Sequence, residues 1–214
     1  MTKSLHVRLI FLIFSIILVP NAVGAQFLNA EIQCNVLASN QKSSSNMVVD
    51  FNDPKEWSLW RSLNDGVMGG KSQGGMTASQ GHGIFTGYIS LANNGGFSSV
   101  VRDIKPLIPA VDSLVIDVAG DGLTYQLRAI VYINGYRLAY KHDFPAVNRK
   151  RKQLTLLLSD FQASFRGRIL SDAPPLLAKN ITEIGLLVTS KNERQFTLNI
   201  FSISGSCANS SGNN

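Results

Sequence analysis

Residues 124–144 read TYQLRAIVYINGYRLAYKHDF, and this stretch carries the clearest structural signal in the sequence. Apolar and polar side chains alternate along 124–133, which is typical of a β-strand with two different faces. One face carries Tyr125, Leu127, Ala129 and Val131, and the other carries Gln126, Arg128, Ile130 and Tyr132. Asn134-Gly135 then leads to a second alternating run at 137–144, and this dipeptide strongly favours a two-residue β-hairpin turn.

Further short apolar or alternating runs predict strands over residues 47–51, 84–91, 98–102, 113–118, 153–158, 183–189 and 196–204. Glycine, asparagine and aspartate separate these runs, and helical periodicity is almost absent. The pattern predicts an all-β domain, an antiparallel β-sandwich or jelly roll. One short helix is expected at 53–63, where Asp53 can cap the first turn and Pro54 suits its first position.

The N-terminal segment has the features of a secretory signal peptide over residues 1–25. Lys3 and Arg8 precede an apolar run at 9–19, and small residues at Val23 and Ala25 suit signal peptidase. The apolar run is shorter than the roughly 20 residues that span a membrane. We therefore expect an exported protein, periplasmic or secreted, that is soluble after cleavage. The predicted order is a linker at 26–46, the β-sandwich domain at 47–206 and a polar tail at 207–214.

Cys34 and Cys207 are the two cysteines of the sequence. Because export leads to an oxidising compartment, the pair favours a disulfide that joins the two ends of the domain. Two free thiols near the chain ends remain the alternative.

The net charge is concentrated in one short segment. The chain has 20 Lys and Arg against 14 Asp and Glu, and removal of residues 1–25 leaves a formal charge of +4. A basic cluster at Arg149, Lys150, Arg151 and Lys152 supplies as much positive charge as that whole excess. It predicts either a patch for an anionic partner, including a membrane surface, or a solvated loop that discourages edge pairing. The rest of the surface is near neutral, so no nucleic-acid binding is expected.

No catalytic motif has the context that its chemistry needs. Gly70-Lys71-Ser72-Gln73-Gly74 matches the G-x-S-x-G pattern, but the strand and helix that position a serine nucleophile are missing around it. His82 and His142 are isolated and have no metal-ligand spacing. We therefore expect no enzyme, no cofactor and no catalytic metal, with a structural calcium ion in an Asp/Asn loop left open.

Three segments carry a resemblance to a known family. They are WSLWRSLNDGVMGGKS at 57–72, NNGGFSSVVR at 93–102 and GDGLTYQLR at 120–128. Together with weaker matches they make the chain similar, over about 48–205, to the complex I intermediate-associated protein 30 family. The resemblance implies a galactose-binding-like β-sandwich without established enzymatic activity, and a role in the assembly of respiratory complex I. This sequence carries a secretory signal and not a mitochondrial one, unlike the mitochondrial members of the family. The assembly role of those members therefore does not transfer directly.

The glycine-rich segments supply most of the predicted binding residues, because glycine lets the backbone turn sharply and approach another group closely. The residues are Trp60, Asn64, Asp65, Gly66, Met68, Gly69, Gly70, Ser72, Asn94, Gly95, Gly96, Phe97, Arg102, Tyr125 and Arg128. We expect Asp65, Arg102 and Arg128 to form a charge cluster on one sheet face. The alternative is that Asp65 ties down its own loop and pairs with an arginine. Trp60 is expected to fill one end of the sandwich or to stack on a sugar.

Two functions are open at this point. The first is a non-enzymatic, exported binding or assembly module that holds a protein partner through these loops and the strand of Arg128. The second is a carbohydrate-binding module for extracellular or cell-envelope glycan, because tryptophan, tyrosine and asparagine side chains suit sugar rings. An ordinary solvated outer face is the competing interpretation for the polar face of 124–133.

Overall fold

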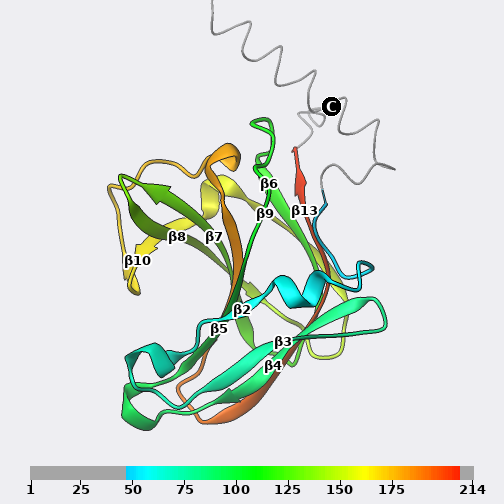
Figure 1. Cartoon of the computed structure of the whole chain (residues 1–214), viewed down its shortest axis with the longest axis vertical. Helices are drawn as coiled ribbons and strands as arrows, with labels where there is room; N and C mark the ends of the chain where they lie inside the picture. Colours follow the sequence, from blue (N-terminus) through cyan, green and yellow to red (C-terminus); the bar gives the residue numbers. More distant parts are fainter. Residues whose placement is uncertain (1–46, 208–214) are drawn as a thin grey trace, which may run out of the picture.

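The alternation along residues 124–144 produces the hairpin that it predicts. β7 (Thr124–Ile133) and β8 (Tyr136–Pro145) pair in antiparallel register with Ile133 opposite Tyr136. Asn134 and Gly135 form the turn with φ values of 51° and 81°, as a two-residue type I′ turn requires. The computed structural model that shows this describes residues 47–207 (Figure 1).

The strands form two antiparallel sheets that pack face to face. The first, called the β13 sheet, has the order β3-β4-β13-β6-β9, with β1 also paired to β13. Its strands are β1 (Met47–Asp50), β3 (Gln73–Ser79), β4 (His82–Ile89), β6 (Ser113–Ala119), β9 (Lys152–Leu157) and β13 (Arg194–Ser206). The second, called the β7 sheet, has the order β11-β10-β8-β7-β12-β5-β2. Its remaining strands are β2 (Arg61–Ser62), β5 (Phe97–Asp103), β10 (Gln162–Phe165), β11 (Arg168–Ile169) and β12 (Glu183–Thr189).

An aromatic cluster fills the space between the sheets. Phe85 and Phe196 from the β13 sheet meet edge to face with ring centroids 4.8 Å apart, and Tyr125 and Phe144 from the β7 sheet pack beside them. All four side chains are buried. Because the apolar face of β7 points into this core, its polar face points outward, as the alternation predicts.

The predicted helix at 53–63 is wrong. The chain forms only a four-residue 3-10 turn, Glu56–Leu59, and then leaves helical geometry at Trp60 to pair as β2 with β5. Trp60 is 8% exposed, and its indole N–H donates to the buried carboxylate of Glu56 at 3.1 Å. Burial of these two side chains and the pairing with β5 therefore override the local helix signal. The other 3-10 turns are Asp65–Met68, Ala92–Asn94, Leu158–Asp160 and Ala178–Asn180.

Strand β3 is not predicted by its sequence, QGGMTAS, because glycine is poor in strands. The structure explains one of these glycines by close packing. A Cβ on Gly74 would lie 2.2 Å from Ser98 Oγ and 2.7 Å from the Phe196 ring. A side chain at this position would therefore push β3 away from β5 and from the core.

No helix among residues 47–207 is long and apolar enough to cross a membrane. The predicted signal peptide and Cys34 lie outside the described residues. Export and the Cys34–Cys207 disulfide therefore stay predictions.

The buried carboxylate of Asp65 joins two loops at one end of the sandwich. It is 1% exposed, and it accepts hydrogen bonds from the Ser72 N–H at 2.9 Å and the Ser72 hydroxyl at 2.5 Å in its own loop. From the loop after β4 it accepts the backbone N–H groups of Gly96 at 2.8 Å and Phe97 at 3.3 Å. Ser72 Oγ in turn accepts the N–H of Ser90 at 3.0 Å. We call this arrangement the Asp65 junction.

Glycines surround the Asp65 junction because its carboxylate occupies the space that side chains would need. A Cβ on Gly70 would lie 2.4 Å from Asp65 Cγ, and one on Gly95 would lie 2.6 Å from Asp65 Oδ2. Gly69 has a φ of 89°, which favours glycine. Gly66 is different, since a Cβ there would meet nothing within 4 Å. Two of the loop glycines are thus explained by packing against one carboxylate.

Gly70→Ala is expected to lower the free energy of unfolding by about 1–3 kcal/mol, because the added methyl group displaces the Asp65 carboxylate. Gly66→Ala in the same loop is the matched control and should change it by no more than about 0.5 kcal/mol. Urea unfolding of the two variants beside the wild type measures the difference. Equal destabilisation by both would contradict the packing explanation.

Asp65→Asn is expected to lower the free energy of unfolding by about 2–4 kcal/mol near neutral pH, because charge-assisted hydrogen bonds are lost in a buried site. Burial by itself raises the pKa of Asp65, but the Ser72 hydroxyl and three backbone N–H groups hold that pKa below its ordinary value. The charged carboxylate therefore stabilises the fold above its unfolded pKa of about 3.9, and this contribution disappears as the pH falls through the folded pKa. The free energy of unfolding, measured between about pH 5 and pH 2, should accordingly fall less steeply in the variant than in the wild type. If the two proteins lost stability in parallel over this range, the ionised Asp65 carboxylate would not be the stabilising group.

Candidate functional site

The predicted charge cluster of Asp65, Arg102 and Arg128 is wrong. Arg102 pairs with Ile184 in the sheet register, on the inner face, whereas Arg128 pairs with Gly185, on the outer face. Because the side chains of neighbouring strand positions point to opposite faces, the two arginines are separated by the sheet itself. Asp65 is bound by a hydroxyl and backbone N–H groups and has no arginine partner among the described residues.

Arg102 and Trp60 belong to a buried structural group. Arg102 Nη1 forms an ion pair with Glu56 Oε1, and both side chains are nearly buried, at 11% and 7% exposed. The Trp60 indole donates to the same Glu56 oxygen, and its ring stacks on Phe51 with centroids 6.5 Å apart. Trp60 therefore fills the core, as one of its two predicted roles requires, and is not available to a ligand.

Most of the predicted loop residues serve the Asp65 junction or its surroundings. Asn64 accepts the Ser98 hydroxyl at 2.7 Å and donates to the Gly74 carbonyl at 3.0 Å, which ties β3 to β5. Gly70, Ser72, Gly95, Gly96 and the N–H of Phe97 hold or surround the Asp65 carboxylate. Gly66, Met68, Gly69 and Asn94 are exposed at the surface.

Tyr125 is also buried. It is 0% exposed and lies on the inner face of β7, and its hydroxyl donates to Asp121 Oδ2 at 3.1 Å. Burial and the neighbouring Asp121 charge both raise its pKa. Asp121 Oδ2 also accepts the Thr197 N–H at 2.8 Å. Tyr125 thus stabilises the contact between the two sheets rather than a ligand.

The basic cluster is exposed, but one of its four charges is matched within the protein. Arg151 Nη2 lies 2.6 Å from Asp117 Oδ2, and its guanidinium lies 3.8 Å from the centre of the Phe201 ring. Arg149 and Lys150 lie in the connection before β9, and Lys152 begins that strand. Because β9 is an edge strand of the β13 sheet, charge at this place discourages edge pairing.

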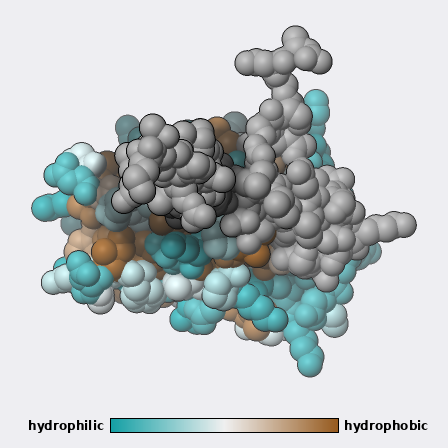
Figure 2. Space-filling view, turned by 90° about the horizontal axis from the view of Figure 1, so that it is seen from above, coloured by the Kyte–Doolittle hydropathy of each residue, from teal (hydrophilic) through white to brown (hydrophobic). Residues whose placement is uncertain are grey.

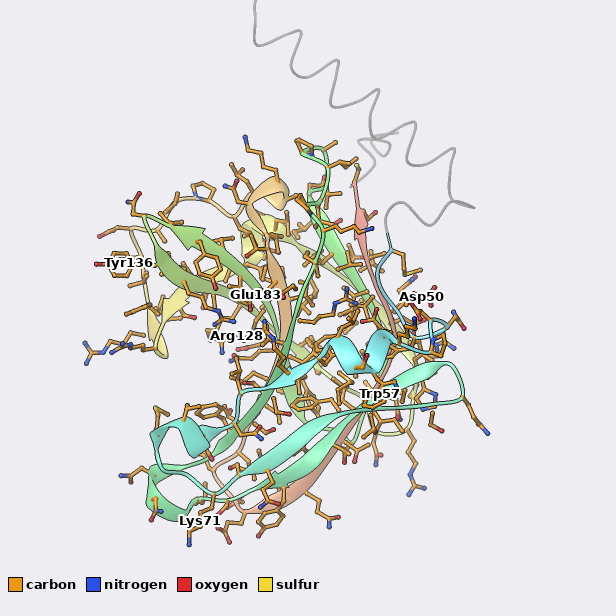
Figure 3. All side chains as sticks on the ribbon, viewed as in Figure 1. Asp50, Trp57, Lys71, Arg128, Tyr136 and Glu183 are labelled. Carbon is orange, nitrogen blue, oxygen red and sulfur yellow. The ribbon has the colours of Figure 1, made fainter. Side chains whose placement is uncertain are left out.

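A row of side chains crosses the outer face of the β7 sheet, from one strand to the next. The register aligns these residues in the order Gln162, Lys141, Arg128, Gly185, Val101 and Arg61, from β10 through β8, β7, β12 and β5 to β2. Val101 of this row forms a small buried apolar cluster with Ile130 and Ala139, separate from the main core. We call this surface, with Tyr132, Arg137 and Glu183 of the neighbouring register positions, the Arg128 face (Figure 3).

Glu183 organises the Arg128 face. It is 5% exposed and accepts hydrogen bonds from Arg137 Nε at 3.2 Å and Nη2 at 2.8 Å, and from the Tyr132 hydroxyl at 3.0 Å. Arg61 Nη2 lies 3.4 Å from its second oxygen and 3.0 Å from Asp103. Burial by itself raises the pKa of Glu183, but Arg137, Tyr132 and Arg61 together hold that pKa below its ordinary value.

Arg128 makes no ion pair or hydrogen bond with any described residue. Its Nε is buried, and it is the one buried side-chain nitrogen or oxygen within residues 47–207 that has no hydrogen-bond partner. Burial and the positive charge of Arg137 both lower the pKa of Arg128. A hollow of about 30 Å³ lies beside it, lined also by Ser99, Arg137 and Gly185. A buried cationic donor without a partner is costly, so this arrangement requires an explanation.

Two larger hollows lie elsewhere. One of about 360 Å³ lies between Met47 and Gly205, at the ends of the described chain, and one of about 180 Å³ is lined mainly by apolar residues such as Val131, Pro174 and Leu176. Seen from above, the surface that is not drawn in grey carries polar and apolar residues side by side (Figure 2). Neither hollow contains a buried polar group with an unmet hydrogen bond like that of Arg128.

Sequence reasoning missed Lys141, Arg137, Glu183 and Arg61. A signal for the first two was present, because a two-residue turn at Asn134-Gly135 places Arg137 opposite Tyr132 and Lys141 opposite Arg128. Glu183 and Arg61 come from strands β12 and β2, whose positions in the sheet follow from long-range pairing. No local pattern contains that information.

The fold is shared with solved carbohydrate-binding modules. A family 11 module from Clostridium thermocellum, solved in complex with a β-1,3-1,4-mixed-linked tetrasaccharide, matches with a TM-score of 0.56 and 14% identity, over 76% of this chain and 95% of the module. The family 11 module of the cellulosomal cellulase Lic26A-Cel5E of Clostridium thermocellum matches with a TM-score of 0.54 and 13% identity, over 70% and 88%. Likeness at this identity concerns the fold, not the ligand. No curated protein matches the sequence at a significant level.

The sequence itself matches a family model over residues 49–200, described as complex I intermediate-associated protein 30. This span includes the Asp65 junction and the whole Arg128 row, and it confirms the resemblance carried by the glycine-rich segments. The chain belongs to the complex I intermediate-associated protein 30 family.

Proposed function

We propose that this protein is an exported, non-catalytic binding module that holds a saccharide on the Arg128 face. The observation that carries the proposal is the arrangement around Glu183, which fixes Tyr132, Arg137 and Arg61 through one buried carboxylate. Side chains that are fixed before binding lose little entropy when a ligand arrives. The side chains on this face that solvent does reach, Tyr132, Arg61 and Arg137, are thus preorganised for a polar ligand.

Tyr132 is the aromatic group best placed for a sugar ring on this face. Its side chain is 55% exposed, while its hydroxyl is held by Glu183 at 3.0 Å. Tyrosine combines an apolar ring, which packs on the apolar face of a sugar, with a polar tip that stays hydrogen-bonded. Carbohydrate-binding modules of similar architecture support the proposal as an analogy of fold, and one of them was solved with a bound tetrasaccharide.

The chemistry of Glu183 favours binding over glycoside hydrolysis. A glycosidase needs a carboxylic acid with a raised pKa that can protonate the leaving group, together with a second carboxylate at a set distance. The pKa of Glu183 is lowered, and Arg137 and Tyr132 already occupy its oxygens. The acid nearest to it through a shared partner, Asp103, is exposed and bound to Arg61. Neither group is prepared to act as a general acid.

Tyr132→Ala is expected to weaken saccharide binding about tenfold or more, because the aromatic anchor of the site is removed. Tyr136→Ala is the matched control, since Tyr136 is 65% exposed in the same hairpin but lies beyond the Glu183 network (Figure 3). A glycan array followed by titration calorimetry provides the measurement. If the folded wild type bound no glycan on the array, the proposed function would be wrong.

A second function, holding a protein partner, is favoured by one specific observation. Val67 and Met68, which are adjacent in the loop of Asp65 and which we call the loop tip, are exposed at 75% and 68%. The Asp65 junction fixes the loop that carries them. Apolar side chains presented together on a rigid loop are typical of a protein contact.

Val67→Ser with Met68→Ser should leave the melting temperature almost unchanged, because both side chains are exposed in the free protein. If the loop tip holds a partner, crosslinking in envelope extracts should give a defined crosslinked species with the wild type and with Tyr132→Ala, but not with the double variant. The same species from all three proteins would exclude the loop tip as the contact.

A further inference from the structure

We infer that the ligand of the Arg128 face is an acidic saccharide, whose carboxylate is received by Arg128. This inference rests on the proposed function and adds the chemical class of the ligand. It follows from the balance of charges on the face, from the register of the strands and from the unmet hydrogen bond of Arg128.

Each positively charged side chain on this face, except Arg128, has a carboxylate partner. Arg61 lies 3.0 Å from Asp103, Arg137 lies 2.8 Å from Glu183, and Lys141 lies 3.9 Å from Asp143. Glu183 cannot serve Arg128 as well, because Tyr132, Arg137 and Arg61 already donate to both of its oxygens. The positive charge of Arg128 is therefore left uncompensated within the described part of the chain.

The register makes this excess charge unfavourable in the free protein. Lys141 lies directly opposite Arg128 on the neighbouring strand, and Arg137 contributes a further positive charge to the same hollow. Like charges in directly opposite cross-strand positions destabilise a sheet. An anion bound at Arg128 removes this repulsion, so the face is better suited to an anionic ligand than to an empty state.

On its other side Arg128 faces a glycine and a hollow that is large enough for water but not for a sugar ring. Gly185 lies opposite Arg128 on β12 and has no side chain to cover the guanidinium, while Ser99 and Val101 of β5 form the further wall of the hollow. A guanidinium presents parallel N–H groups that match the two oxygens of a carboxylate. The hollow of about 30 Å³ has room for one or two water molecules. Such a water can accept the hydrogen bond of the buried Nε and donate one to the ligand, and so bridge the two.

A residue kept for ligand binding should differ from a structural arginine in its effect on stability. Arg128→Met is expected to melt at or above the wild-type temperature, because it removes an unpaired charge and its repulsion with Lys141. Arg102→Met is expected to melt well below it, because it leaves the buried carboxylate of Glu56 without a positively charged partner. This comparison needs no ligand.

The binding test uses two probes on the whole mature protein, a galacturonic acid tetramer and a neutral mixed-linked glucose tetrasaccharide. The wild type is expected to bind the acidic probe at least about tenfold more tightly than the neutral one. Added salt should weaken the binding of the acidic probe and leave the binding of the neutral probe unchanged. Arg128→Met should abolish the preference, while Arg194→Met, which removes an exposed charge in the β13 sheet, should keep it.

The outcomes separate this inference from the proposed function. Binding of the neutral probe with no preference for the acidic one would overturn the inference and leave the saccharide module in place. Undiminished acidic preference in Arg128→Met would also overturn it, since the anion would then bind elsewhere, for example at Arg149 and Lys150. Failure of the wild type to bind either probe, or any glycan on the array, would overturn both.

Discussion

The hydrogen bonds of the Asp65 carboxylate are the constraint on which one end of this sandwich depends. A single buried anion holds the backbone of two loops that come from different parts of the chain. The glycines at positions 70 and 95 are present because the carboxylate needs their space. The residues that carry most of the family resemblance are therefore explained by the construction of the fold, and they do not by themselves indicate a binding site.

The buried charges of this protein fall into two groups, those with partners inside the fold and Arg128, which has none among the described residues. Asp65 and the Glu56–Arg102 pair are buried charges with their partners supplied from within, which is how a folded protein accommodates them. Arg128 is the exception, because its neighbours are cations and its buried Nε has no partner. Strain or unmet bonding that persists in a stable fold is most simply explained by a function. This contrast is the reason for proposing the binding surface on the Arg128 face rather than on the glycine-rich loops.

The sequence predicts local features well and long-range arrangements poorly. Alternation and the Asn134-Gly135 turn predict the central hairpin and the face to which Arg128 points. The helix at 53–63 is not formed, because Trp60 inserts into the core and the chain then pairs with β5. Strand β3 is missed because its glycines allow close packing that only the folded neighbours reveal. The predicted cluster of Asp65, Arg102 and Arg128 fails at Arg102, because β5 reads FSSVVRD and has no alternation that reveals which face Arg102 takes.

The proposed ligand lies across the β7 sheet at Arg128. Backbone amide shifts in an NMR titration with the galacturonic acid tetramer test this placement most directly, because they locate the ligand without any substitution. We expect the largest shifts at the amides of Arg128, Lys141 and Gly185, with little change at the Asp65 junction. Shifts concentrated instead in the loops at 65–72 and 91–97, or at residues 149–152, would contradict it.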